Sequence, residues 1–76
     1  MMREIARTAG FVLFEYSSAD GWRNLKLARS PQVRGIKSNW WLGWNGERLS
    51  RKRDARVLEE DEPEVFSWLV TVLTQP

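Results

Sequence analysis

The chain contains no cysteine and no histidine among its 76 residues. Without cysteine there is no disulfide and no thiolate metal site, and a zinc ion would have only carboxylate ligands. We therefore expect neither a metal nor another cofactor. Histidine is also the commonest general acid–base residue, and cysteine is a strong nucleophile, so most enzyme active sites would lack their key groups here. The sequence predicts a protein that is not an enzyme.

Long apolar runs are missing as well. The longest, Phe11–Phe14, is shorter than a signal-peptide core of about 7–15 residues or a membrane span of about 20 residues. We expect no membrane partner and a cytoplasmic location, with which the absence of cysteine agrees.

The length allows one domain, spanning residues 1–76. So small a domain has a thin core and needs heavy core residues or a partner subunit when disulfides and metals are absent. The five tryptophans and three phenylalanines favour the first solution, because each ring buries about 150–250 Å². They leave open a homodimer.

Charge is divided unevenly along the chain. Residues 1–56 carry a net charge of +7, and residues 57–76 carry −5. The basic part suggests a polyanion as partner. The alternative interpretation is that acids gather at a helix start, where they complement the helix dipole, and leave an ordinary basic surface elsewhere.

Alternating and β-branched patterns predict strands at residues 11–16, 22–29 and 36–44. In residues 22–29, Leu25 and Leu27 point one way while Asn24 and Lys26 point the other. Asn45–Gly46 then predicts a two-residue type I′ hairpin. That loop would pair Leu42 with Leu49 and Gly43 with Arg48 in the returning strand.

The C-terminal part predicts a helix. Asp61 is the expected N-cap, Pro63 is tolerated in the first turn, and an apolar stripe follows at helical spacing. Val57–Leu58 is a candidate for a brief last strand. Residues 1–9 are expected to form a short helix or a flexible arm. The fold class is thus α+β: an antiparallel meander of three to four strands with a C-terminal helix packed on one face.

One surface stands out as a candidate binding site. If Trp40, Leu42 and Trp44 face the helix, strand alternation turns Trp41 outward. A tryptophan among cations suits single-stranded DNA or RNA, because cations attract phosphates and the indole stacks on a base. The candidate nucleic-acid-binding residues are Lys37, Asn39, Trp41, Arg48, Lys52 and Arg53.

A second class of function stays open, a protein-interaction module or a homodimer. Tryptophan and arginine are enriched at interface hot spots, and Trp68 widens the apolar stripe of the helix beyond one sheet face. Basic side chains on strands also have a purely structural use, since they keep sheet surfaces soluble.

Overall fold

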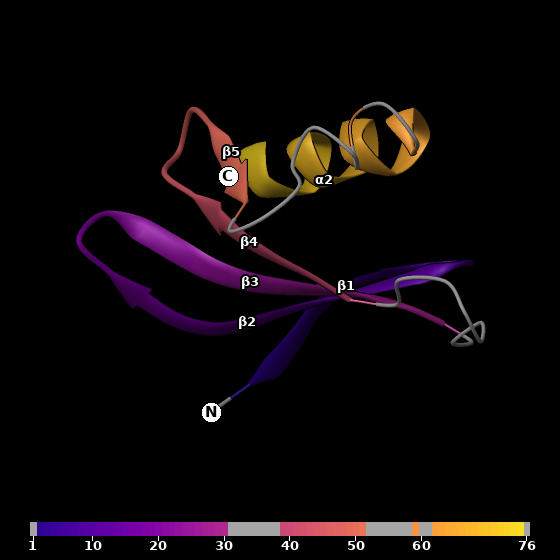
Figure 1. Ribbon diagram of the computed structural model, residues 1–76, viewed down its shortest axis with the longest axis horizontal. Coiled ribbons are helices and arrows are strands. Elements are labelled where there is room, and N and C mark those ends of the chain that lie inside the picture. Colours follow the sequence, from indigo (N-terminus) through magenta and orange to yellow (C-terminus); the bar gives the residue numbers. More distant parts are fainter. Residues whose placement is uncertain (1, 31–38, 52–58, 60–61, 76) are drawn as a thin grey trace.

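The protein is a five-stranded antiparallel sheet followed by a C-terminal helix (Figure 1). The computed structural model describes residues 2–30, 39–51, 59 and 62–75. The elements are β1 (Arg3–Thr8), β2 (Phe11–Ala19), β3 (Trp22–Arg29), β4 (Asn39–Trp44), β5 (Leu49–Arg51) and α2 (Pro63–Thr74). The strands neighbour one another in chain order, as in a meander. The predicted α+β class is confirmed, with more strands than predicted.

The first strand, β1, corrects the expectation of a helix or flexible arm at residues 1–9. It pairs with β2 across the Ala9–Gly10 turn, and Ala6 lies opposite the fully buried Leu13. The register shifts between Glu4 and Ala6, so Ile5 is an extra residue that interrupts strict alternation. Both Ile5 and Ala6 pack against the core. This bulge produced the irregular apolar spacing that resembled a helix.

A two-residue turn joins β2 to β3 at Asp20–Gly21, since Ala19 pairs directly with Trp22. The φ angles of Asp20 and Gly21 are +54° and +79°. Positive φ at both central residues is what a type I′ turn requires, and this turn matches the right-handed twist of the strands that it joins.

The β4–β5 connection differs from the predicted hairpin at Asn45–Gly46. Trp44 pairs with Leu49 and Leu42 with Arg51, so the loop is Asn45–Arg48 and the predicted Leu42–Leu49 pairing is wrong. Gly46 has a positive φ but Asn45 does not. Instead, Oδ1 of Asn45 accepts hydrogen bonds from the backbone N–H groups of Glu47 and Arg48, at 2.9 and 2.7 Å. These side-chain hydrogen bonds stabilise a longer loop in place of the predicted type I′ turn.

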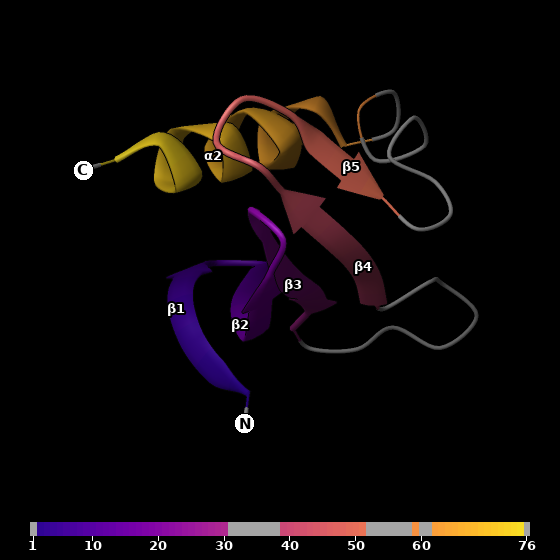
Figure 2. The ribbon, with the colours of Figure 1, turned by 90° about the vertical axis from the view of Figure 1, so that its left-hand side faces the viewer.

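The core lies between the sheet and α2, which runs along one face of the sheet (Figure 1). As predicted, Leu25 and Leu27 on β3 are fully buried, and the alternate residues Trp40, Leu42 and Trp44 of β4 are buried as well. From the helix, Leu69 and Leu73 complete the core, and Trp68 packs against it. Figure 2 shows β5 beside the helix, with β1, β2 and β3 on the other side of β4.

The helix begins at Pro63, and its N-cap is Glu62 in place of the predicted Asp61, which lies outside the described residues. A residue before proline is disfavoured in the helical conformation, and Glu62 has an extended φ of −134°. Its carboxylate makes no capping bond but accepts a 2.7 Å hydrogen bond from Arg29 of β3. The Arg29 guanidinium also lies over the rings of Phe11 and Trp40. This contact joins the start of the helix to the sheet.

The candidate strand at Val57–Leu58 lies outside the described residues, as do residues 36–38 of the predicted third strand. In the part of the chain that the structure describes, no helix combines the length and apolar character needed to cross a membrane.

We expect Trp40→Ala to lower the free energy of unfolding by about 3–5 kcal/mol, because Trp40 is only 5% exposed and the change leaves a cavity in the core. Chemical denaturation measures this loss. The matched control is Trp41→Ala, at the next residue, where the side chain is 44% exposed and the loss of its contacts with Tyr16 and Lys26 should cost about 1–2 kcal/mol. A larger loss at Trp41 than at Trp40 would contradict the assignment of the two faces.

Candidate nucleic-acid interface

The sheet face opposite the helix carries a row of three side chains on neighbouring strands. Phe14 of β2 lies opposite Lys26 of β3, and Lys26 lies opposite Trp41 of β4. Residues directly opposite in antiparallel strands point to the same side of the sheet. Leu25 and Leu27, the chain neighbours of Lys26, are buried on the helix side, so the row lies on the other side.

The ammonium group of Lys26 lies between the two rings of this row. Its Nζ is 5.5 Å from the centre of the Trp41 ring and 6.0 Å from that of Phe14. Both contacts are within reach of cation–π attraction, which contributes about 0.5–1 kcal/mol at an exposed site. No described carboxylate pairs with Lys26. The positive charge is therefore held among aromatic rings and is not neutralised by an acid of the described part.

Two more aromatic side chains extend the row. The register shifts between Glu15 and Ser17, and the extra residue, Tyr16, lies edge-to-face with Trp41 at 5.4 Å between ring centres. Trp22 covers Gly43 of β4: a Cβ atom at Gly43 would lie 3.1 Å from Cε3 of Trp22. A glycine in this strand thus leaves space for an indole. We call the following set the aromatic face: Phe14, Tyr16, Trp22, Lys26 and Trp41.

The aromatic face is only partly covered. Trp41 is the most exposed of its rings, and Phe14, Tyr16 and Trp22 are half-buried. At the β1 edge of the same side, Glu4 and Arg7 form a 2.7 Å ion pair, and the hydrogen bond from Arg7 lowers the pKa of Glu4. Since this pair is neutral, it adds no net charge beside Lys26.

Most other described arginines form ion pairs with glutamates of the chain. Glu15, on the helix side, accepts hydrogen bonds from Arg23 at 2.7 Å and from Arg3 at 3.1 Å, and these bonds lower the pKa of Glu15. Arg29 is paired with Glu62. The positive charge counted along residues 1–56 is therefore partly neutralised by ion pairs, which weakens net charge alone as an argument for a polyanion partner.

The structure describes three of the six predicted site residues, Asn39, Trp41 and Arg48. Trp41 is exposed, as predicted. Asn39 is half-buried on the same side of β4, and its Oδ1 is buried without a hydrogen bond from any described residue. Lys37, Lys52 and Arg53 lie outside the described residues.

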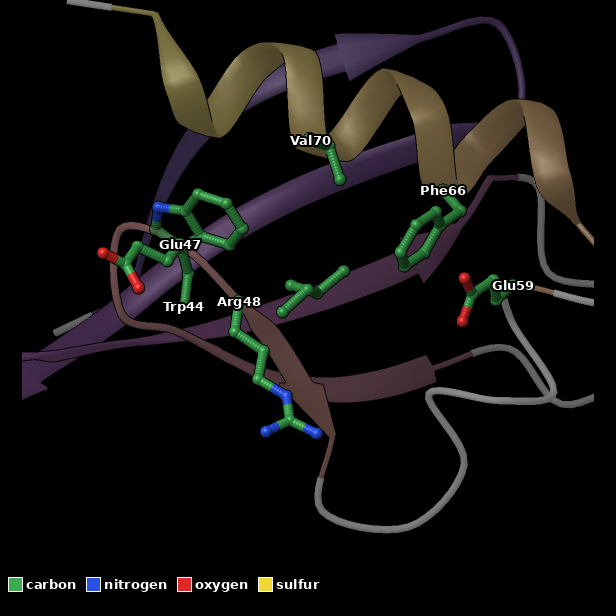
Figure 3. A pocket seen from close by; sticks show the side chains of 7 residues that line it. Trp44, Glu47, Arg48, Glu59, Phe66 and Val70 are labelled. Carbon is green, nitrogen blue, oxygen red and sulfur yellow. The ribbon is translucent and has the colours of Figure 1, made fainter.

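The expectation that Arg48 lies on the same surface as Trp41 is corrected by the structure. The longer β4–β5 loop leaves Arg48 unpaired with β4, at a pocket of about 550 Å³ between the hairpin and α2 (Figure 3). Apolar side chains line much of this pocket, and Glu47 and Glu59 are also there: the apolar ones are Trp44, Leu49, Phe66 and Val70.

Sequence reasoning missed the cation that does contact Trp41, which is Lys26. The alternation of residues 22–29 already turned Lys26 away from the core, but only the register between β3 and β4 brings it to Trp41. The same register was needed to place Phe14, while the contact between Tyr16 and Trp41 depends on a bulge that no sequence pattern indicated.

Metal-binding groups are sparse in the described ranges, where no three acidic side chains gather around a common point. Comparison with known proteins gives no match to any family model, curated protein or solved structure.

We expect Gly43→Val to lower the free energy of unfolding by about 1–3 kcal/mol, because the added methyl groups meet the Trp22 indole. A red shift of the tryptophan fluorescence should accompany the loss as Trp22 is displaced. Ser50→Val is the matched control, since Ser50 lies opposite Gly43 on β5 and is exposed, and it should change stability by no more than about 0.5 kcal/mol. Equal stability of the two variants would show that Trp22 does not depend on Gly43.

Proposed function

We propose that this chain is a non-catalytic binding module that takes single-stranded DNA or RNA on its aromatic face. The observation that carries the proposal is the Phe14–Lys26–Trp41 row, in which an ammonium group lies between two partly exposed rings. Unpaired bases stack on aromatic rings whatever their identity, and a cation beside the rings attracts the phosphate.

The magnitudes favour a weak interaction. Stacking contributes about 1–3 kcal/mol per base, so two rings supply about 2–6 kcal/mol before the cost of ordering the strand. Because 4.1 kcal/mol corresponds to a Kd of about 1 mM and each 1.4 kcal/mol to a tenfold change, the described face alone supports a Kd of about 40 μM at the strongest and about 30 mM at the weakest. An affinity of this order suits a module that acts on a strand held nearby by other means.

The non-catalytic part of the proposal rests on the chemistry of the residues present. The chain has no histidine or cysteine, and the described carboxylates of Glu4, Glu15 and Glu62 are each held by arginine. The cytoplasmic location expected from the composition is retained as part of the same proposal.

A protein partner or a second copy of the chain is the competing use of this face. The feature that first suggested it was Trp68, which is half-buried against the core and lines a surface pocket with Phe11 and Val65. The exposed part of Trp41 remains compatible with a protein contact, so the experiment below includes an arm that detects self-association.

The test is a fluorescence titration with an oligothymidylate of about twelve nucleotides, a length within the usual site sizes of about 4–16. Trp41→Ala should weaken binding about 5- to 150-fold, which corresponds to the loss of one stacking contact. Lys26→Gln should reduce the slope of log affinity against log salt by about 0.7, the value for one phosphate on a single strand. The unfolding transition of each variant checks that its fold is retained.

Arg48→Gln is the matched control, because it removes the same charge from the loop beside α2 and should leave binding and its salt slope nearly unchanged. Binding that is insensitive to both Trp41→Ala and Lys26→Gln would refute the proposal. A dimer on a sizing column that Trp41→Ala dissociates, without oligonucleotide binding, would instead support the protein-partner alternative.

A further inference from the structure

The two rings of the row are too far apart for a helically stacked strand to occupy both. Phe14 and Trp41 are on strands separated by β3, and neighbouring strands lie about 4.7–4.9 Å apart, so the backbones that carry the rings are about 10 Å apart. Neighbouring bases in a stacked nucleic-acid strand are about 3.4 Å apart. Two consecutive bases that stack on each other therefore cannot also cover both rings.

The position of Lys26 fixes where a phosphate would lie. Its Nζ is at similar distances from the two ring centres, 5.5 and 6.0 Å. A strand that laid one base on each ring would carry its linking phosphate above β3, next to this ammonium. The strand would then cross the β-strands along the row, because the row itself runs from β2 to β4.

Polar groups near the row offer little means of reading base edges. The amide nitrogen of Asn24 donates to the Ser17 hydroxyl at 3.0 Å, and Oδ1 of Asn39 is buried. Stacking strength and strand flexibility, which are the usual sources of modest preference in such sites, are therefore the main basis of selection that we expect on this side.

We infer that the aromatic face selects an unstacked, pyrimidine-rich single strand, with one base on Phe14, one on Trp41 and the phosphate between them over Lys26. This inference rests on the proposed function and names its substrate class. Pyrimidines are favoured because they lose the least base–base stacking when the strand is splayed over the two rings. A duplex is excluded because its base faces are already covered by neighbouring pairs.

The experiment compares three ligands of equal length with the full chain at one low salt concentration: oligothymidylate, oligodeoxyadenylate and the duplex of the two. We expect oligothymidylate to bind at least about fivefold more tightly than oligodeoxyadenylate, and the duplex to bind more weakly than either strand. Equal or tighter binding of oligodeoxyadenylate or of the duplex overturns the inference but leaves nucleic-acid binding intact. No saturable binding of any ligand overturns the proposed function and the inference together.

A second arm tests the two-base footprint. An oligothymidylate with an abasic site at every second position cannot place neighbouring bases on both rings, so it should bind the wild-type chain about 5- to 150-fold more weakly than the intact strand. The same abasic ligand should lose much less affinity when tested on Phe14→Leu, which already lacks one stacking ring. An equal loss on both proteins would show that Phe14 takes no base and would overturn the footprint.

Discussion

The alternation of side chains along β4 is the constraint on which the rest of the structure depends. Successive residues of a strand point to opposite faces, so the sequence Trp40–Trp41–Leu42–Gly43–Trp44 serves two surfaces at once. Trp40, Leu42 and Trp44 are nearly or fully buried beneath α2, where a chain without disulfides needs large apolar side chains. Trp41 is left on the other face as a direct consequence, and Gly43 provides the space for Trp22. Core and candidate site are two sides of one strand.

Ion pairs within the fold neutralise several of the arginine charges that a ligand could otherwise meet. Arg3 and Arg23 converge on Glu15, Arg7 pairs with Glu4, and Arg29 joins the sheet to the helix through Glu62. The Arg29–Glu62 pair is partly shielded from water and accompanied by ring contacts with Phe11 and Trp40, a setting in which ion pairs are screened less than at an open surface. Lys26 differs from these arginines because rings, rather than a described carboxylate, surround its charge.

The local patterns of the sequence predicted the α+β class, the strands β2, β3 and β4, the helix and the opposite directions of Trp40 and Trp41, because each depends on neighbours in the chain. What could not be predicted depends on pairing between strands. Asn45–Gly46 and Asp20–Gly21 are both suited to a type I′ turn, and only the second adopts positive φ at both residues. At Asn45–Gly46, the side chain of Asn45 instead accepts hydrogen bonds from the backbone of its own loop. The β4–β5 register is therefore shifted by two residues from the predicted one, and Arg48 does not lie beside Trp41. The register between β3 and β4 places Lys26 beside Trp41. The bulges at Ile5 and Tyr16 break the alternation of side chains, so no periodic pattern indicated β1 or the contact of Tyr16 with Trp41.

The most direct test of this division into two faces is to follow the five indole N–H signals by NMR while an oligothymidylate is added. The account predicts that the signals of Trp41 and Trp22 shift with saturation, whereas those of Trp40, Trp44 and Trp68 stay in place, because these three pack in or against the core. Shifts confined to Trp44 and Trp68, or a titration that moves no indole signal, would contradict it.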